Sequence, residues 1–315
     1  MTEVRLKIAL TALLVVIDTL WIVARGFTFD LPSLGLCLGV TALMASIAIV
    51  YTKFRPDVRL ATMSTETGFL IAYSAAASVF SYLVTTLDFP LIDNSLVQVD
   101  HALGFDWYAY VGFVNARPWL GMLSSAVYQT TLAQIALSVV LLTMLGRTDR
   151  TRELTLTVMV SSFFCVVISG LLPAVGALAH HRPLESFYMQ NQPVVDLAYK
   201  QVYFDIRNGL NTHLGLTDVH GLIAFPSYHV GLSVILILAF RGMRGWFWPI
   251  VALNLAVILS TPIDGGHHLS DGLGGIVLAL ACSAAVVKFR ARLGKTALSA
   301  SSGEDDHAQL AGQKT

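Results

Sequence analysis

Residues 246–289 read WFWPIVALNLAVILSTPIDGGHHLSDGLGGIVLALACSAAVVKF, and this stretch decides the fold class. It holds two apolar runs, Trp246–Pro262 and His268–Phe289, on either side of a short polar turn. Because a helix of roughly 20 mostly apolar residues can cross a lipid bilayer, each run predicts a membrane-spanning helix. The turn between them holds glycines, histidines and acids, and it is the first candidate for a functional site.

The composition of the whole chain also indicates a membrane protein. Of the 315 residues, 55% are hydrophobic and 13% are charged, with no formal net charge. Soluble domains have roughly 25% charged residues, so this chain has too few charges to cover a soluble surface. These values exclude a nucleic-acid binder, a secreted disulfide scaffold and a disordered chain. The length criterion gives six more candidate spans: Leu6–Ala24, Leu31–Tyr51, Gly68–Leu87, Leu120–Leu145, Leu154–Leu178 and Ile223–Phe240.

Basic residues predict the orientation of this bundle of about eight helices. When the N-terminus is placed inside, the inner connections are short and hold most of the Lys and Arg residues, as cytoplasmic loops do. Both termini are then cytoplasmic, and two long connections, Asp88–Trp119 and Ala179–Leu222, lie at the outer face with the turn Ile263–His267. The second long connection includes Asp218 and His220. Long loops of mixed chemistry commonly carry function, so we place the candidate site at the outer face.

The chain divides into three parts and has no internal repeat. We predict accessory transmembrane helices in residues 1–67 and a membrane core in residues 68–293. Residues 294–315 are rich in serine and acidic residues, and we predict a disordered cytoplasmic tail there. The whole chain is then an all-α integral membrane protein whose first partner is the bilayer.

Two polar clusters stand at the predicted outer face. The first, Phe225-Pro226-Ser227-Tyr228-His229, begins the sixth span; Pro and Ser favour a helix start, whose free N–H groups attract anions. The second extends from Ser260 to Asp271 and includes Gly265-Gly266. Within it, His267 and Asp271 are four residues apart, which places them on one face of a helix. The carboxylate can then hold one ring nitrogen and leave the other free as a base or nucleophile.

Each of these features also has an ordinary structural explanation. A lone His, a Pro-Ser pair and a Gly-Gly pair are commonly an interface residue, a helix cap and a turn. Together they favour function, because polar groups close to hydrocarbon are costly. A metal site is an alternative, with His229, Asp264, His267, His268 and Asp271 as possible ligands. The chain has no HExxH helix for a metalloprotease and no Gly-x-Ser-x-Gly nucleophile for a serine protease.

These motifs resemble those of the type-2 phosphatidic acid phosphatase superfamily of integral-membrane enzymes. Its second motif, PSxH, is matched by Pro226-Ser227-Tyr228-His229, and its third, SRxxxxxHxxxD, by Ser260, His267 and Asp271. The stretches LGFDW, GLIAFPSYH and STPIDGGHHLSDGLGG resemble the branch that contains fungal inositol phosphorylceramide synthases and their bacterial relatives. The resemblance covers roughly Leu87 to Phe289.

The resemblance implies a six-helix phosphatase-like core and a two-step phosphoryl transfer that needs no metal or other cofactor. His267 is the implied nucleophile and forms a phosphohistidine, Asp271 orients it, and His229 moves the proton. The implied contacts of the phosphoryl oxygens are nearby backbone N–H groups, Ser227, Ser260 and Gly266. His268 is the rival nucleophile, but one step along a helix turns a side chain by about 100°, which favours His267.

Two cationic groups of the superfamily are absent from this chain. The first motif, KxxxxxxRP, has Tyr110 in place of Lys before Arg117-Pro118 and Val175 before Arg182-Pro183, and Thr261 replaces the Arg of the third motif. A phosphodiester carries one negative charge and a phosphomonoester nearly two, so fewer cations favour a diester substrate. A cation from an outer loop can restore the charge. The candidates are Arg117, Arg182, Arg207 and His213, of which we favour Arg207.

We therefore predict a membrane lipid phosphotransferase that moves a phosphorylated head group, such as phosphoinositol, or a phosphoryl group between lipids. Its partners are a lipid donor and a lipid alcohol, or water, as acceptor. A lipid phosphate phosphatase acting on phosphatidic acid or a polyprenyl phosphate is the first alternative. A non-catalytic transporter on the same fold is the second. The expected location is a bacterial inner membrane, with the site facing the periplasm or extracytoplasmic side.

Overall fold

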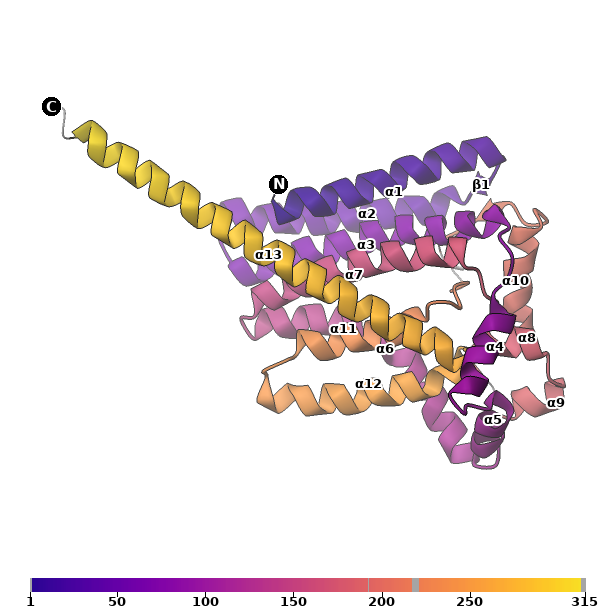
Figure 1. The fold of residues 1–315 in the computed structure, drawn as a ribbon. Coiled ribbons are helices and arrows are strands. Elements are labelled where there is room, and N and C mark those ends of the chain that lie inside the picture. Colours follow the sequence, from indigo (N-terminus) through magenta and orange to yellow (C-terminus); the bar gives the residue numbers. More distant parts are fainter. Residues whose placement is uncertain (1, 192, 217–220, 313–315) are drawn as a thin grey trace.

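The computed structural model describes residues 2–191, 193–216 and 221–312, without the side chains of Tyr199 and of residues 295–312. The chain forms a bundle of long helices (Figure 1). These are α1 (Glu3–Arg25), α2 (Leu31–Ile49), α3 (Val58–Val84), α6 (Pro118–Met144), α7 (Thr148–Leu171), α12 (Arg244–Asp264) and α13 (Leu269–Gly312), with the shorter α11 (Tyr228–Ala239) among them. A π-helical turn, η1 (Val50–Phe54), follows α2.

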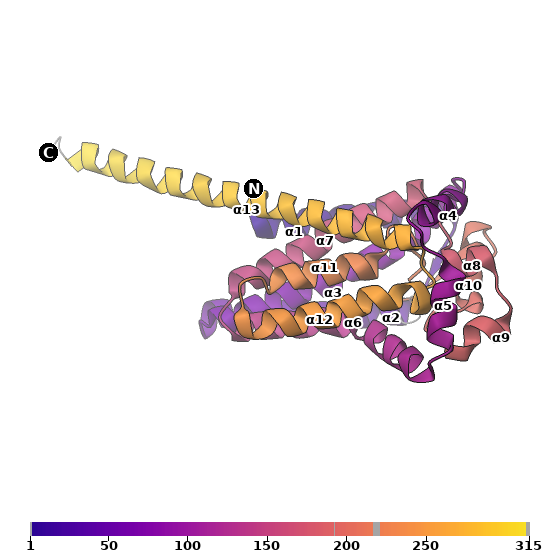
Figure 2. The same ribbon diagram turned by 60° about the horizontal axis from the view of Figure 1, so that its bottom comes forward.

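Short elements gather at one end of the bundle, which we call the loop-rich end (Figures 1 and 2). They are α4 (Asp93–Ala102), α5 (Trp107–Asn115), α8 (Ala177–His181), α9 (Glu185–Tyr188) and α10 (Leu197–Arg207), with the 3₁₀ turns η2 (Thr85–Leu87) and η3 (Met189–Asn191). The two short strands β1 (Thr28–Phe29) and β2 (His213–Leu214) pair in parallel. The two long connections predicted from the sequence therefore lie together, as their common side of the membrane requires.

Seven helices in the described part of the chain are long and apolar enough to cross a membrane. They are α1, α2 extended by η1, α3 extended by η2, α6, α7, α12 and α13 up to Gly294, while α11 is a shorter apolar helix in the place of the sixth predicted span. The prediction of an all-α, multi-pass membrane protein is confirmed.

The structure corrects three of the predicted helix boundaries. The third span begins at Val58 rather than Gly68, because the Asp57 carboxylate accepts hydrogen bonds from two backbone N–H groups and caps the helix there. The fifth ends at Leu171, since Pro173 disfavours a helical conformation in the residue before it. In the sixth, α11 begins only at Tyr228, after Pro226. The chain that follows α7 and the described chain just before α11 are irregular, and both supply backbone to the loop-rich end.

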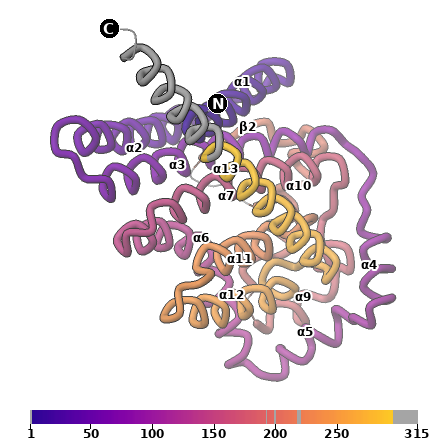
Figure 3. The backbone as a smooth tube through the Cα atoms, turned by 60° about the vertical axis from the view of Figure 1, so that its left-hand side comes forward, coloured from indigo at the N-terminus to yellow at the C-terminus, as the bar shows by residue number. Residues whose placement is uncertain are grey.

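The centre of the bundle is α11, which contacts α6, α7, α12 and α13. Its inward face is almost wholly buried and includes Val230, Leu232, Ile235 and Leu236. By contrast, α2 packs on α3, and α1 packs on α3 and, to a smaller extent, α7. These two N-terminal helices lie on the flank formed by α3 (Figure 3). The polar clusters thus lie on α11 and its neighbours α12 and α13 and not on the two N-terminal helices.

Two expectations from the sequence concern the C-terminal tail and the polar residues of the second long connection. The backbone of α13 is helical to Gly312, and the disordered tail expected for residues 294–315 stays a prediction. Side chains from Lys295 onward and residues 313–315 lie outside the described part of the chain, so nothing here tests the role of that tail. Asp218 and His220, which we expected among the polar residues of the outer connection, also lie outside the described residues.

Candidate active site

His267 and Asp271 meet at the junction between α12 and α13. His267 Nδ1 lies 3.2 Å from Asp271 Oδ2, and both side chains are buried. The contact does not form along a helix as the spacing suggested, because His267 lies before the first turn of α13 and Gly266 turns the chain with a φ of 61°. The carboxylate holds Nδ1 of His267. The second ring nitrogen, Nε2, takes no part in this contact. His267 is therefore a buried imidazole with a fixed orientation.

Asp271 also organises the start of α13. Its Oδ2 accepts a hydrogen bond of 2.8 Å from the backbone N–H of His268, the residue before the helix. A carboxylate in the third helical position that reaches back in this way satisfies an otherwise unpaired donor. It also places negative charge near the positive end of the helix dipole. Asp271 therefore fixes both the ring of His267 and the first turn of the helix that carries Asp271 itself.

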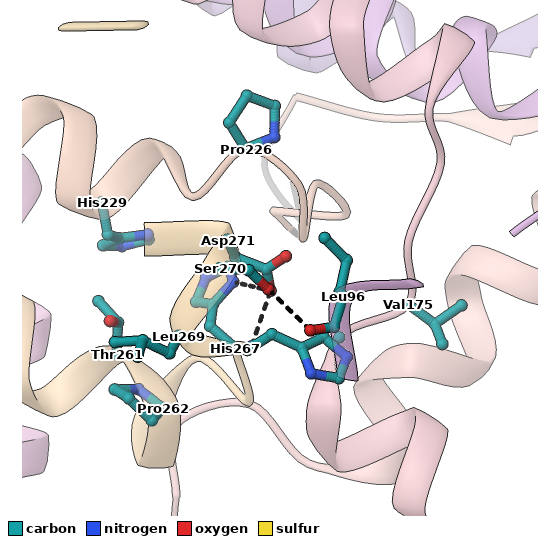
Figure 4. A network of polar contacts seen from close by, with 12 residues as sticks. Leu96, Val175, Pro226, His229, Thr261, Pro262, His267, Leu269, Ser270 and Asp271 are labelled. Carbon is teal, nitrogen blue, oxygen red and sulfur yellow. Dashed lines mark hydrogen bonds and ion pairs between the residues drawn. The ribbon is translucent and has the colours of Figure 1, made fainter. Parts of the chain in front are cut away.

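His229 comes to the same place from the first turn of α11. Its ring stacks on Tyr128 of α6, with ring centroids 4.3 Å apart, and the Tyr128 hydroxyl lies 3.3 Å from His229 Nδ1. Figure 4 shows His229 directed from α11 toward the start of α13, where His267 and Asp271 lie. Nothing in the sequence marked Tyr128 as a site residue, because it belongs to an apolar span with no recognisable motif.

One cavity of about 530 Å³ is lined by both histidines. Near them its wall includes Gly265, Tyr128 and Lys200. Farther along, the lining residues are Leu132 and Ile135 of α6, Val158 of α7, Leu232 of α11, and Ser74, Ala77, Ser78 and Ser81 of α3. Several of these lie midway along spanning helices, so the cavity extends from the histidines toward the level of the membrane interior. Its shape suits a molecule that has a polar end and a long apolar part.

Lys200 is a second residue of this cavity, after Tyr128, that we did not predict as a site residue. It belongs to α10, only 3% of it is exposed, and it lines the cavity with His229 and His267. Burial lowers the pKa of Lys200 to about 8, while the carboxylates of Asp271 and Asp93 act in the opposite direction. The sequence offers one indication of a role for Lys200: it is one of the few basic residues in the predicted outer connection Ala179–Leu222.

His268 occupies a different environment from its neighbour His267. Its Nε2 lies 3.4 Å from Asp93 and its Nδ1 3.5 Å from Asp100, both on α4, and it does not line the cavity. Burial alone lowers the pKa of His268, but the carboxylates of Asp100, Asp93 and Asp271 outweigh this effect and raise the pKa to about 9. His268 is thus a buried cation that ties the turn to α4.

The helix α4 braces the turn through its carboxylates. Asp100 accepts hydrogen bonds of 3.0 and 2.8 Å from the backbone N–H groups of Leu269 and Ser270, the first two residues of α13. Asp93 accepts hydrogen bonds from the backbone N–H groups of Val175 and Gly176. Every buried helix start needs such partners for its free N–H groups. The acids of α4 supply them, and they hold the His267 turn against the chain before α8.

Three of the predicted phosphate contacts lie beside the cavity rather than in its wall. Ser260 Oγ donates to the Val257 carbonyl, and Ser227 Oγ is buried with no hydrogen-bond partner among the described residues. Gly266 packs against α8, since a Cβ there would lie 2.8 Å from Leu178 Cβ, and Gly265 lines the cavity in its stead. The lack of a side chain at Gly266 thus permits close packing against α8. The lack of a side chain at Gly265 lets the backbone line the cavity.

The cationic residues favoured from the sequence lie away from the cavity. Arg207 pairs with Asp88 at 2.8 Å and donates to the Phe89 carbonyl. Arg117 stacks on the ring of Phe113. Arg182 donates to the Ala179 carbonyl, and His213 contacts Thr28 in the small sheet. None of the four is in the cavity wall.

The positions of the missing cations carry structural groups. Tyr110, in the place of the first-motif Lys, donates a hydrogen bond of 2.7 Å to the Leu259 carbonyl of α12. Trp107 donates to the carbonyl of Pro262. Thr261, in the place of the third-motif Arg, donates to the Ile258 carbonyl. The helix α5 therefore supports the end of α12 from which the His267 turn departs.

The possible metal ligands are divided between separate environments. Asp264 accepts hydrogen bonds from the hydroxyl groups of Ser124 and Ser125, and His268 lies between the acids of α4. Among the described residues, no group of three or more His, Cys, Asp or Glu side chains has the arrangement of a metal site.

The fold and this site define a class of protein. A bundle of apolar helices places a His-Asp pair and a second histidine, which come from two separate motifs, at one end of a cavity. A family model described as the PAP2 superfamily matches residues 94–285, so the chain belongs to that superfamily. No curated protein and no solved structure matched the chain significantly. Membership supports phosphatase or phosphotransferase chemistry in general.

Proposed function

We propose that this protein is a membrane lipid phosphotransferase, which moves a phosphorylated head group from a donor lipid to an alcohol-bearing acceptor lipid. The observation that carries the proposal is the shared cavity of His229 and His267, whose wall is mostly apolar and extends toward the middle of the bundle. Two imidazoles at the polar end of an apolar cavity suit a substrate whose phosphate is attached to lipid chains.

The first half-reaction uses the free nitrogen of His267. As His267 Nε2 bonds to phosphorus, the bond between phosphorus and the donor's glycerol oxygen breaks. The departing oxygen takes a proton from His229. Asp271, 3.2 Å from the opposite ring nitrogen, stabilises the positive charge that develops on His267. His229 acts in this step as an imidazolium: its Nδ1–H faces the Tyr128 hydroxyl at 3.3 Å, its Nε2 carries the transferable proton, and loss of that proton leaves the neutral imidazole.

The second half-reaction reverses these roles. The acceptor hydroxyl gives its proton to His229, its oxygen bonds to phosphorus, and the bond between phosphorus and His267 breaks. Both histidines return to their starting states. If water enters in place of a lipid alcohol, the same steps release the head group or phosphate, which is the phosphatase reaction.

The small number of cations supports a diester substrate. The two cations of the superfamily motifs are replaced by Tyr110 and Thr261, both engaged in backbone hydrogen bonds. A phosphodiester such as phosphatidylinositol carries one charge and needs less compensation than a terminal phosphate. Together with the resemblance to inositol phosphorylceramide synthases, this supports phosphoinositol as the transferred group.

The position of the site supports an extracytoplasmic reaction. The short connections at the end of the bundle opposite the loop-rich end are rich in Arg and Lys, as cytoplasmic loops are. On this basis we place the loop-rich end on the periplasmic side of a bacterial inner membrane. Donor and acceptor would then both come from the bilayer.

Product analysis tests the proposal. Purified protein in lipid nanodiscs is given phosphatidylinositol labelled with ³²P, together with ceramide or with a diacylglycerol whose acyl chains differ from the donor's, in the presence of a chelator, and His267→Ala serves as the control. A new labelled lipid phosphodiester that is absent from the control is the expected result. Release of water-soluble label from phosphatidylinositol with no new lipid would show a phosphatase. In a parallel assay with phosphatidic acid as the lipid, release of inorganic phosphate would show the same. No product from any of these lipids would contradict catalysis and favour a transporter, and a need for added metal would contradict the proposed mechanism.

A further inference from the structure

The wall of the cavity contains a single Lys or Arg side chain among the described residues, and it is Lys200. This residue lies outside every motif that the superfamily resemblance supplies. The positions where those motifs have Lys and Arg are held by Tyr110 and Thr261, which bond to backbone carbonyls of α12. A reaction at phosphorus in a partly apolar cavity still needs a positive group near the equatorial oxygens. The position of Lys200 meets that need.

The fold brings Lys200 to the cavity by the packing of α10. Tyr203 and Ile206, three and six residues farther along the helix, are buried in one apolar cluster with Val79 and Leu83 of α3. The face of α10 that carries Tyr203 and Ile206 into this cluster also carries Lys200 inward. The long aliphatic stem of lysine suits such a half-apolar path, because it packs while its amino group reaches polar surroundings.

We propose that Lys200 is the phosphate-binding cation of this enzyme and takes the place of the cations missing from the superfamily motifs. The proposal rests on the function proposed above and names the residue that recognises the negative charge of the lipid phosphodiester. Two histidines that act on phosphorus and one lysine line the same 530 Å³ space, so a phosphate within reach of His267 lies in the space that Lys200 borders. One lysine balances one phosphodiester charge.

The surroundings of Lys200 fit this role. The carboxylates of Asp271 and Asp93 favour its charged form, while burial lowers its pKa to about 8, so the amino group is largely protonated at neutral pH. A buried charge has few water molecules to screen it, so its attraction for a phosphate is stronger than that of a surface lysine. Arg207, our expectation from the sequence, lies at the C-terminal end of α10, where it pairs with Asp88 and donates to the Phe89 carbonyl, and it is not in the cavity wall.

Direct binding tests the proposal without turnover. The probe is dihexanoyl phosphatidylmethanol, a short-chain phosphodiester lipid with one charge, and dihexanoylglycerol is its uncharged counterpart. Binding to purified protein is measured for wild type, Lys200→Met, Lys200→Arg and Gln201→Met. Gln201 is an exposed neighbour on α10 and controls for changes in the helix. We expect Lys200→Met to weaken binding of the phosphodiester about tenfold or more, as loss of a charged hydrogen bond does. Lys200→Arg should restore most of the affinity, and dihexanoylglycerol should bind all four proteins equally.

The outcomes separate this proposal from the proposed function. Equal affinity of wild type and Lys200→Met for the phosphodiester overturns the role of Lys200, even if the wild type transfers head groups. Arg207→Gln is measured in the same way as a fifth protein. If it loses phosphodiester affinity while Lys200→Met retains it, the role belongs to Arg207 and the proposal is overturned. A charge-dependent loss in Lys200→Met supports the proposal even if product analysis finds no transfer. Equal loss of the uncharged lipid in Lys200→Met would show a structural effect and would overturn it too.

Discussion

Nδ1 of His267 lies 3.2 Å from Oδ2 of Asp271, and that same oxygen accepts the backbone N–H of His268. One carboxylate therefore orients the proposed nucleophile and completes the first turn of α13. The two roles respond differently to substitution, because the first needs a negative charge and the second needs only an acceptor atom.

Substitution of Asp271 separates these roles. Asp271→Asn keeps an oxygen for the N–H of His268 but removes the charge that stabilises the His267 imidazolium. We expect its turnover to fall by about 100-fold or more, with little change in thermal unfolding. Asp271→Ala removes the acceptor as well and should unfold more easily by on the order of 1 kcal/mol. Initial rates and thermal unfolding in detergent micelles measure both quantities, and wild-type turnover in Asp271→Asn would refute the orienting role.

The ion pairs of His268 predict a dependence of stability on pH. Because the pKa of His268 is raised from 6.5 to about 9 in the folded protein, the folded state binds this proton more tightly than the unfolded state. The stabilisation is complete below about pH 6.5 and is lost as the pH rises through about 9, with a size on the order of 3 kcal/mol. Thermal unfolding measured between these pH values should show the loss in wild type. His268→Gln, which has no proton to lose in this range, should show a much smaller slope. Parallel curves for the two proteins would contradict the ion pairs.

Close backbone packing predicts the effect of a single methyl group at Gly176. This glycine has a φ of 85°, and a Cβ there would lie 2.6 Å from the carbonyl oxygen of Gly266. Gly176→Ala should therefore push the α8 start away from the His267 turn and destabilise the protein by roughly 1–3 kcal/mol. Gly294 in α13 has no atom within 4 Å of the same position, so Gly294→Ala is the matched control and should cost nothing. Unfolding temperatures and turnover of the two variants check this, and equal behaviour would contradict the close approach.

The spanning helices and the two motifs were predictable because both depend on local sequence. Apolar runs of sufficient length select helices in a membrane, and the residues after Pro226 and around His267 are adjacent in the chain. The pairing of His267 with Asp271 was predicted as well, although the reasoning assumed one continuous helix. The turn at Gly266 forms the contact before the helix begins.

The residues contributed by distant segments were not predictable from one sequence. Tyr128 stacks on His229 from across the bundle, and Lys200 enters the cavity from a connection without a regular pattern. The carboxylates of Asp93 and Asp100 reach His268 and the start of α13 only because α4 lies across the loop-rich end. No spacing rule links residues so far apart, since their positions follow from the packing of whole helices. Arg207 was favoured among the outer-loop cations without knowledge of this packing, and it lies outside the cavity wall.

The last prediction assigns the covalent step to His267. His267→Ala should abolish turnover for every substrate, because no other group in the cavity takes its place as nucleophile. His229→Ala should keep the first half-reaction with a good leaving group such as p-nitrophenol, since an oxygen that leaves easily needs little help from an acid. The measurement is trapping of ³²P-labelled protein, which should be labile in acid and stable in alkali, as a phosphohistidine is. We expect label in wild type and in His229→Ala, and none in His267→Ala. Label that persists in His267→Ala and disappears in His268→Ala would identify the neighbour as nucleophile, against its position between Asp93 and Asp100. Turnover without label under any condition would make His267 a general base for direct attack by the acceptor.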